Sequence, residues 1–213
     1  MWLSSIIYSF FFHSCKSFTY IYINLPQERQ RSLEIESSFK KKSNCELHRI
    51  VPVEINNSDG FIVQLVDQHN IYAGPGAWRD HMNGIYSRSE MSIMMTYKKA
   101  LKYIVDNHLP APYVILEDDL NLNNTVSFYT LEQSIREAPQ NWEILQYHVT
   151  NSMARKSFCN LKDDFIRWLP EFYSTSCTVV KDRSVALSII EEDITGHHVL
   201  DYWLYNSWIS YTH

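Results

Sequence analysis

Glycine, proline and cysteine are all scarce in this sequence of 213 residues, which has five, seven and four of them. So few glycines exclude a glycine-rich phosphate loop, and the close pair at Gly74 and Gly76 flanks a proline, which favours a turn. The cysteines form no C-x-x-C pair, so a structural zinc site is not expected. Their spacing leaves open whether the chain forms two disulfides or none.

Basic stretches are lacking as well. The formal net charge is −5, and the densest basic run is only Lys40–Lys42, which is typical of a solvated helix end. No basic stripe is present that could follow a nucleic-acid backbone, so nucleic acid is not an expected partner. The length and an apolar content of 45% suit one globular domain with a full core.

A long hydrophobic run is also missing. The apolar stretch within residues 1–16 is shorter than the roughly 20 residues that a membrane-spanning helix needs, and no basic segment precedes it. Residues 1–18 are therefore interpreted as an apolar extension, a weak signal or an extra packed segment. A cytoplasmic, a membrane-associated and a secretory location all stay open, and the folded domain is expected over residues 19–213.

Short apolar runs alternate with helical patterns along the rest of the chain. Strands are predicted at 19–25, 47–55, 113–116, 142–147 and 178–180. Helices are predicted at 27–42, 88–107, 125–137, 182–192 and 201–206. This order predicts an α/β domain with a mostly parallel central sheet, and the turn formers in residues 56–86 predict a long irregular segment over a site.

Three carboxylates, Glu117, Asp118 and Asp119, directly follow the predicted strand at 113–116. Ligands of open α/β sheets bind beyond the carboxyl ends of the strands. If the extended geometry continued, Glu117 and Asp119 would point the same way, which suits Mg²⁺ or Mn²⁺. The competing interpretation is an acidic loop that caps the next helix.

The order of several motifs resembles glycosyltransferase family 25, the lipopolysaccharide biosynthesis and collagen β-galactosyltransferase type. The segments that match the family's motifs are Tyr22–Arg31, Ser89–Tyr97, Val114–Asp119 and Trp142–Leu145, with weaker matches at Ser174–Lys181 and Asp201–Leu204. Together they cover about residues 19–205. The chain departs from the family pattern at Thr96 and Tyr97, where members have Ser-His, and it lacks the glycine of the fifth motif.

The resemblance implies a single GT-A-like nucleotide-sugar-binding domain. It implies a metal-dependent hexosyltransferase that uses Mn²⁺ or Mg²⁺ and inverts the anomeric centre. The sugar, galactose by default, would pass from a UDP donor to a hydroxyl of a glycan, glycolipid or glycoprotein. The alternative is a catalytically degenerate member that acts as a glycan-binding or scaffold protein.

The resemblance also implies roles for individual residues. The donor-binding candidates are Asn24, Leu25, Arg31, Arg49, Val53 and Glu54. The metal candidates are Glu117 and Asp119, and the catalytic candidates are Asp201 as general base, Asp118 and Glu90. Structural interpretations compete for three of them: a solvated helix position for Arg31, a capping box with Ser87 for Glu90, and a helix cap for Asp201.

Overall fold

The computed structural model describes residues 18–42, 46–54, 88–120, 128–148, 164–169, 172, 174–192 and 200–213. Within the helices, the side chains of residues 42, 88–91 and 128–130 lie outside this description. The predictions for the N-terminal segment and for residues 56–86 fall outside the described residues. Among the cysteines, Cys177 is described, and it is a buried free thiol.

The described residues form the following strands and helices, given in chain order. They are β1 (Thr19–Ile23), α1 (Arg29–Lys42), β2 (Leu47–Ile50), α3 (Arg88–Asp106), β3 (Tyr113–Glu117), α4 (Phe128–Glu137), β4 (Ile144–Gln146), β5 (Ile166–Arg167), β6 (Cys177–Val180), α6 (Arg183–Glu191), α7 (Leu200–Ser207) and β7 (Ser210–Thr212).

The strands form one sheet in the order β2-β1-β3-β6-β4-β7-β5. β1 pairs in parallel with β2 and β3, and β4 pairs in parallel with β7. β6 lies antiparallel between β3 and β4, and β5 lies antiparallel to β7. The predicted α/β class is therefore confirmed, but the sheet is mixed because β5 and β6 run against the other strands.

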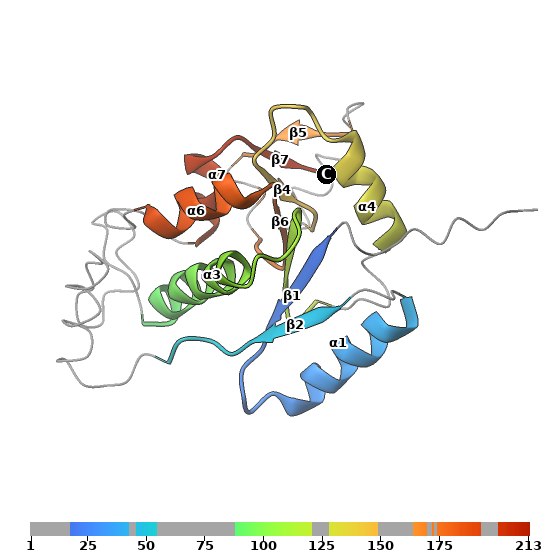
Figure 1. Ribbon diagram of the computed structural model, residues 1–213, viewed down its shortest axis with the longest axis vertical. Helices are drawn as coiled ribbons and strands as arrows, with labels where there is room; N and C mark the ends of the chain where they lie inside the picture. The colour runs from blue at the N-terminus through green and yellow to red at the C-terminus, as the bar shows by residue number, and fades with distance from the viewer. Residues whose placement is uncertain are drawn as a thin grey trace, which may run out of the picture.

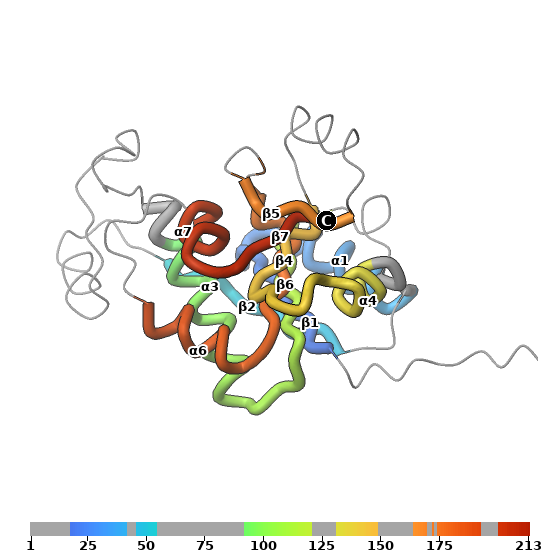
Figure 2. Tube along the Cα trace, turned by 90° about the horizontal axis from the view of Figure 1, so that it is seen from above, coloured from blue at the N-terminus to red at the C-terminus, as the bar shows by residue number. Residues whose placement is uncertain are grey.

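Helices cover both faces of this sheet, which gives three layers (Figure 1). α1 and α4 lie on one face, and α3, α6 and α7 lie on the other, as the view from above also shows (Figure 2). Alternation along β1 explains the two cores, because Tyr20 and Tyr22 pack toward α1 and α4 while Ile21 packs toward α3, α6 and α7. The methionine stripe of α3 is core, with Met94 and Met95 both buried.

Each predicted strand and helix has a counterpart in the described residues, with shifted ends. The strand predicted at 47–55 ends at Ile50, and Pro52, which has no amide hydrogen for a ladder, follows soon after. β5 and β7 were not predicted, because strands of two and three residues are too short to show a period. No helix in the described ranges is long and apolar enough to cross a bilayer.

The carboxyl ends of β1, β2 and β3 meet at one edge of the sheet, as their parallel pairing requires. The amide of Asn24, just after β1, donates to the carbonyl of Ile50 at the end of β2, with N and O 3.1 Å apart. The antiparallel β6 starts at the same edge, where the Glu117 amide donates to the Ser176 carbonyl at 3.0 Å. Residues from distant parts of the chain therefore gather here.

Candidate functional site

The three consecutive acids lie where β3 turns away from the sheet. β3 ends at Glu117, and Asp118 and Asp119 form a turn in which the Leu120 amide donates to the Glu117 carbonyl at 3.2 Å. The extended geometry assumed from the sequence therefore stops at Glu117, and strand alternation does not decide where the acids point. All three acids instead line one pocket.

This pocket has a volume of about 620 Å³ and lies at the carboxyl edge of the sheet between the β1, β2 and β3 ends and α3. Its apolar wall is formed by Ile23, Leu25, Pro52, Val53 and Ile93. Its polar wall is formed by Gln27, Arg31, Glu54, Ser92, Thr96, Tyr97, Glu117, Asp118 and Asp119. Leu25 and Ile93 are 40% and 44% exposed, so the pocket presents apolar surface to solvent beside carboxylates.

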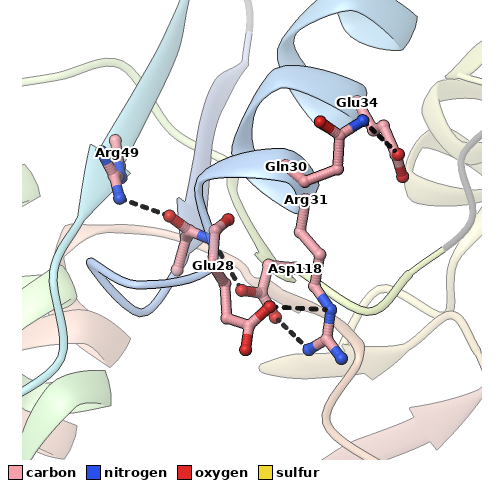
Figure 3. Close-up of polar contacts among 7 residues, drawn as sticks. Glu28, Gln30, Arg31, Glu34, Arg49 and Asp118 are labelled. Carbon is pink, nitrogen blue, oxygen red and sulfur yellow. Dashed lines mark hydrogen bonds and ion pairs between the residues drawn. The ribbon is translucent and has the colours of Figure 1, made fainter.

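A polar network around Asn24 shapes the acidic side of the pocket. Asn24 is buried, its amide nitrogen donates to Asp118 Oδ2 at 2.7 Å, and its side-chain oxygen accepts from Arg49. Arg31 reaches Asp118 Oδ1 at 3.6 Å and Glu28 at 3.6 Å (Figure 3). Asp118 is therefore held by two partners from outside β3, and Arg31 brings a cation to the pocket wall.

The backbone of Val53 is hydrogen-bonded to two side chains of α3. Its amide donates to Thr96 Oγ1 at 2.9 Å, and its carbonyl accepts from Ser92 Oγ at 2.5 Å. Two small hydroxyl residues one turn apart on α3 thus hold the segment after β2 against the helix. This contact places Pro52, Val53 and Glu54 along the rim of the pocket.

Glu117, which lines the pocket, and Asp201, which does not, both interact with Thr175. The Thr175 hydroxyl donates to Glu117 Oε1 at 2.5 Å, and its proximity to Asp201 partly lowers the pKa of that carboxyl. Burial, followed by the neighbouring charges of Asp119, Asp201 and Asp118, raises the pKa of Glu117 to about 7. Burial likewise raises the pKa of Asp201 to about 6, so both groups resist ionisation in the absence of a counter-charge.

The Thr175 segment is itself tied to buried tyrosines. Tyr97 donates its hydroxyl to the Thr175 carbonyl at 3.0 Å, and Tyr205 donates to the Ser174 carbonyl at 2.8 Å. Both tyrosines also contact the Thr178 hydroxyl, at 3.2 Å for Tyr97 and 2.8 Å for Tyr205. The backbone that presents Thr175 to the acids is therefore fixed from two sides.

The chemistry of these acids fits a hard divalent cation. In the described ranges, no group of three or more His, Cys, Asp or Glu side chains converges as a complete ligand set. Mg²⁺, however, usually takes only one or two carboxylates and completes its shell with water and phosphate oxygens. The Thr175 hydroxyl donates to Oε1 of Glu117, and no described residue donates to Oε2, which is therefore available to a cation. Glu117 and Asp119 are the residues that would hold it, since Arg31 and Asn24 occupy Asp118.

Most of the residues selected from the sequence come together at this edge. Those that line the pocket are Leu25, Arg31, Val53, Glu54, Glu117, Asp118 and Asp119. Asn24 and Arg49 adjoin it through the hydrogen-bond network. Asp201 does not line the pocket and lies in the first turn of α7, where it reaches the acids through Thr175. The side chain of Glu90 lies outside the described residues.

Thr175, Ser92 and Thr96 are the residues that sequence reasoning missed as contributors to the site. Thr175 lies 58 positions from Glu117, and only the antiparallel pairing of β3 with β6 brings them together. Thr96 was noticed only as a departure from a family motif, and Ser92 only within the matched segment Ser89–Tyr97. Their i, i+4 spacing places Ser92 and Thr96 on one face of the helix, and this spacing could have indicated that both contact the segment after the second strand.

No protein-family model matches the chain. No curated protein matches it at a significant level either.

Proposed function

We propose that this protein is a metal-dependent glycosyltransferase with a GT-A-like domain. It would transfer a sugar, galactose by default, from a UDP donor to a hydroxyl of a glycan, glycolipid or glycoprotein. The observation that carries the proposal is one pocket at the carboxyl edge of the sheet that joins an apolar wall to Arg31 and three carboxylates. A nucleoside diphosphate sugar has the matching parts, a flat base and a charged diphosphate.

The apolar wall suits the base and ribose of such a donor. Leu25, Val53 and Ile93 offer partly exposed apolar surface, and Glu54 at the same rim offers a carboxylate to ribose hydroxyls. Arg31 faces the acids and supplies a planar donor fork for a phosphate. Mn²⁺ or Mg²⁺ bound by Glu117 and Asp119 would neutralise charge on the diphosphate leaving group.

The proposed reaction is a single displacement. An acceptor oxygen bonds to the anomeric carbon as the bond to the diphosphate breaks, and the hydroxyl proton passes to a carboxylate of the protein. Asp201 remains the proposed base, with Asp118 and Glu90 as alternatives. Because Asp201 does not line the pocket, it would act on the acceptor hydroxyl through one water molecule. An Asp201→Asn variant should lose transfer while it still binds donor and Mn²⁺. Loss of donor binding in that variant would assign Asp201 to the binding of donor and ion.

Release of UDP from nucleotide sugars is the direct test of the proposal. The purified chain with excess Mn²⁺ should hydrolyse UDP-galactose or another UDP-sugar slowly without acceptor. EDTA and Asp119→Ala should abolish this release. Hydrolysis that persists in both cases would contradict a metal-dependent mechanism.

A degenerate, non-catalytic relative is the second candidate. One observation favours it, since Thr96 and Tyr97 replace the Ser-His of the resembled family and both hydroxyls are used in structural contacts. Such a protein would bind nucleotide sugar or glycan and release no UDP under any metal condition. The hydrolysis assay therefore separates the two candidates.

A further inference from the structure

The two carboxylate oxygens of Glu117 differ in their hydrogen-bond partners. Oε1 accepts the 2.5 Å hydrogen bond from Thr175, whereas Oε2 has no hydrogen-bond donor within the described part of the chain. Glu117 lines the pocket at the end of β3. A carboxylate fixed through one oxygen leaves the other available in a defined direction, which is the state that a monodentate ligand needs.

The residue that fixes Glu117 is itself held by the core of the domain. Thr175 is buried, with 8% of its surface exposed. Its carbonyl accepts from Tyr97, and the preceding carbonyl of Ser174 accepts from Tyr205 and from the Gln146 amide at 2.9 Å. The backbone that carries the Thr175 hydroxyl is therefore held by the core of the domain.

We infer that Thr175 is the positioning residue of the proposed metal site, because its hydroxyl orients Glu117 toward the cation and links it to Asp201. The inference rests on the proposed function, since it assumes that Glu117 ligates the ion. Thr175 itself touches neither ion nor donor. Partners of this kind typically change metal affinity by roughly 10- to 100-fold when they are lost.

The test measures Mn²⁺ affinity, by electron paramagnetic resonance of free Mn²⁺, on purified chain without any sugar donor. Thr175→Val removes the hydroxyl at nearly constant volume and should weaken Mn²⁺ binding roughly ten-fold. Thr175→Ser keeps the hydroxyl and should bind within about two-fold of wild type. Thr175→Cys has a weak donor and should behave like the valine variant, so it gives a second measurement if Thr175→Val fails to fold.

Thr19→Val is the matched control. Thr19 is also buried and donates its hydroxyl to a backbone carbonyl, that of Pro110, at 2.6 Å, but it lies at the opposite end of β1 from the acids. It should lose stability to a similar degree and leave Mn²⁺ affinity unchanged. An equal fall in affinity in both variants would show that Thr175 acts only through general stability.

A double-mutant cycle shows whether Thr175 acts through Glu117. In a Glu117→Gln background, Thr175→Val should cause no further loss of Mn²⁺ affinity. Wild-type affinity in Thr175→Val, or an additive loss in the double variant, overturns the inference while the proposed function stands. If the wild-type chain binds no Mn²⁺ even when UDP is present to supply phosphate oxygens, the proposed function fails, and the inference fails with it.

Discussion

Asn24 and Asp118 are joined across two adjacent strand ends by a hydrogen bond of 2.7 Å from the Asn24 amide to Asp118 Oδ2. Asn24 is only 1% exposed, and Arg49 donates to its side-chain oxygen. One neutral amide thus mediates between a cation and an anion from different strands. This contact fixes the acidic turn relative to β1, where the proposed donor site begins.

Replacing this amide by a carboxylate should destabilise the domain. Asn24→Asp removes the donor to Asp118 and places two acids together in a buried position, which should lower the free energy of unfolding by roughly 2 kcal/mol at pH 7.5. Gln27→Glu adds the same charge at an exposed position of the pocket and should change stability by less than about 0.5 kcal/mol. Urea unfolding in EDTA measures both, and equal midpoints for the two variants would contradict the role given to Asn24.

Arg31 should matter for binding more than for folding. Its contact with Asp118 is 3.6 Å long and its side chain is 49% exposed, so Arg31→Ala should change stability by less than about 1 kcal/mol. The same variant should weaken UDP binding by roughly ten-fold, because it removes a phosphate partner from the pocket wall. Isothermal titration with UDP and Mn²⁺ measures this.

Arg29→Ala is the control for Arg31, since Arg29 is exposed, begins the same helix and does not line the pocket. It should bind UDP like wild type. A similar loss in both variants would indicate a general electrostatic effect of α1, and the specific contact of Arg31 with phosphate would then be excluded.

The apolar wall of the pocket predicts a separate effect on binding of the nucleotide's base. Ile93→Ser should weaken UDP binding about five-fold, which corresponds to the loss of about 1 kcal/mol of apolar contact, with little change in stability. Leu169→Ser is the matched control, because Leu169 is similarly exposed at 48% and does not line the pocket. If pyrophosphate binding falls as much as UDP binding in Ile93→Ser, Ile93 does not contact the base.

The metal-free protein should lose stability as the pH rises. The pKa of Glu117 is raised from 4.5 to about 7, so its favourable contribution is complete below pH 4.5 and disappears as the pH rises through 7. The change should be on the order of 1–3 kcal/mol, since solvent in the pocket screens part of it. Glu117→Gln should flatten this part of the profile in urea unfolding with EDTA. An identical slope in wild type and variant would contradict the burial of this acid.

Much of the fold could be predicted from the sequence because the apolar periodicity of each helix or strand lies within a short stretch of residues. The helix at 88–107 and the strand at 113–116 each carry a clear apolar pattern, and both appear with small shifts at their ends. The reversed direction of β6 could not be predicted, because Cys177–Val180 is buried on both faces and an apolar run has no direction.

Part of the candidate site could also be predicted from the sequence. The acids after β3 were expected at the carboxyl edge of the sheet because ligands of open α/β sheets bind there, whereas the residues after β1 and β2 were expected from the family resemblance. The hydrogen bond from Thr175 to Glu117 could not be predicted from the sequence, since it depends on the antiparallel direction of β6 and on packing around Tyr97 and Tyr205. Loss of strand geometry at Asp118 was also missed, because the sequence does not show where a strand gives way to a turn.

The central claim is that one pocket holds a nucleotide sugar together with a divalent cation through Asp119. Thermal unfolding of wild type with UDP-galactose, UDP-glucose and UDP-N-acetylglucosamine, each with Mn²⁺ or with EDTA, tests it most directly. We expect at least one donor to raise the melting temperature only when Mn²⁺ is present. The shift should vanish in Asp119→Ala and persist in Asp106→Ala, an exposed acid outside the pocket. No shift with any donor, or an equal shift in EDTA or in Asp119→Ala, would contradict the account.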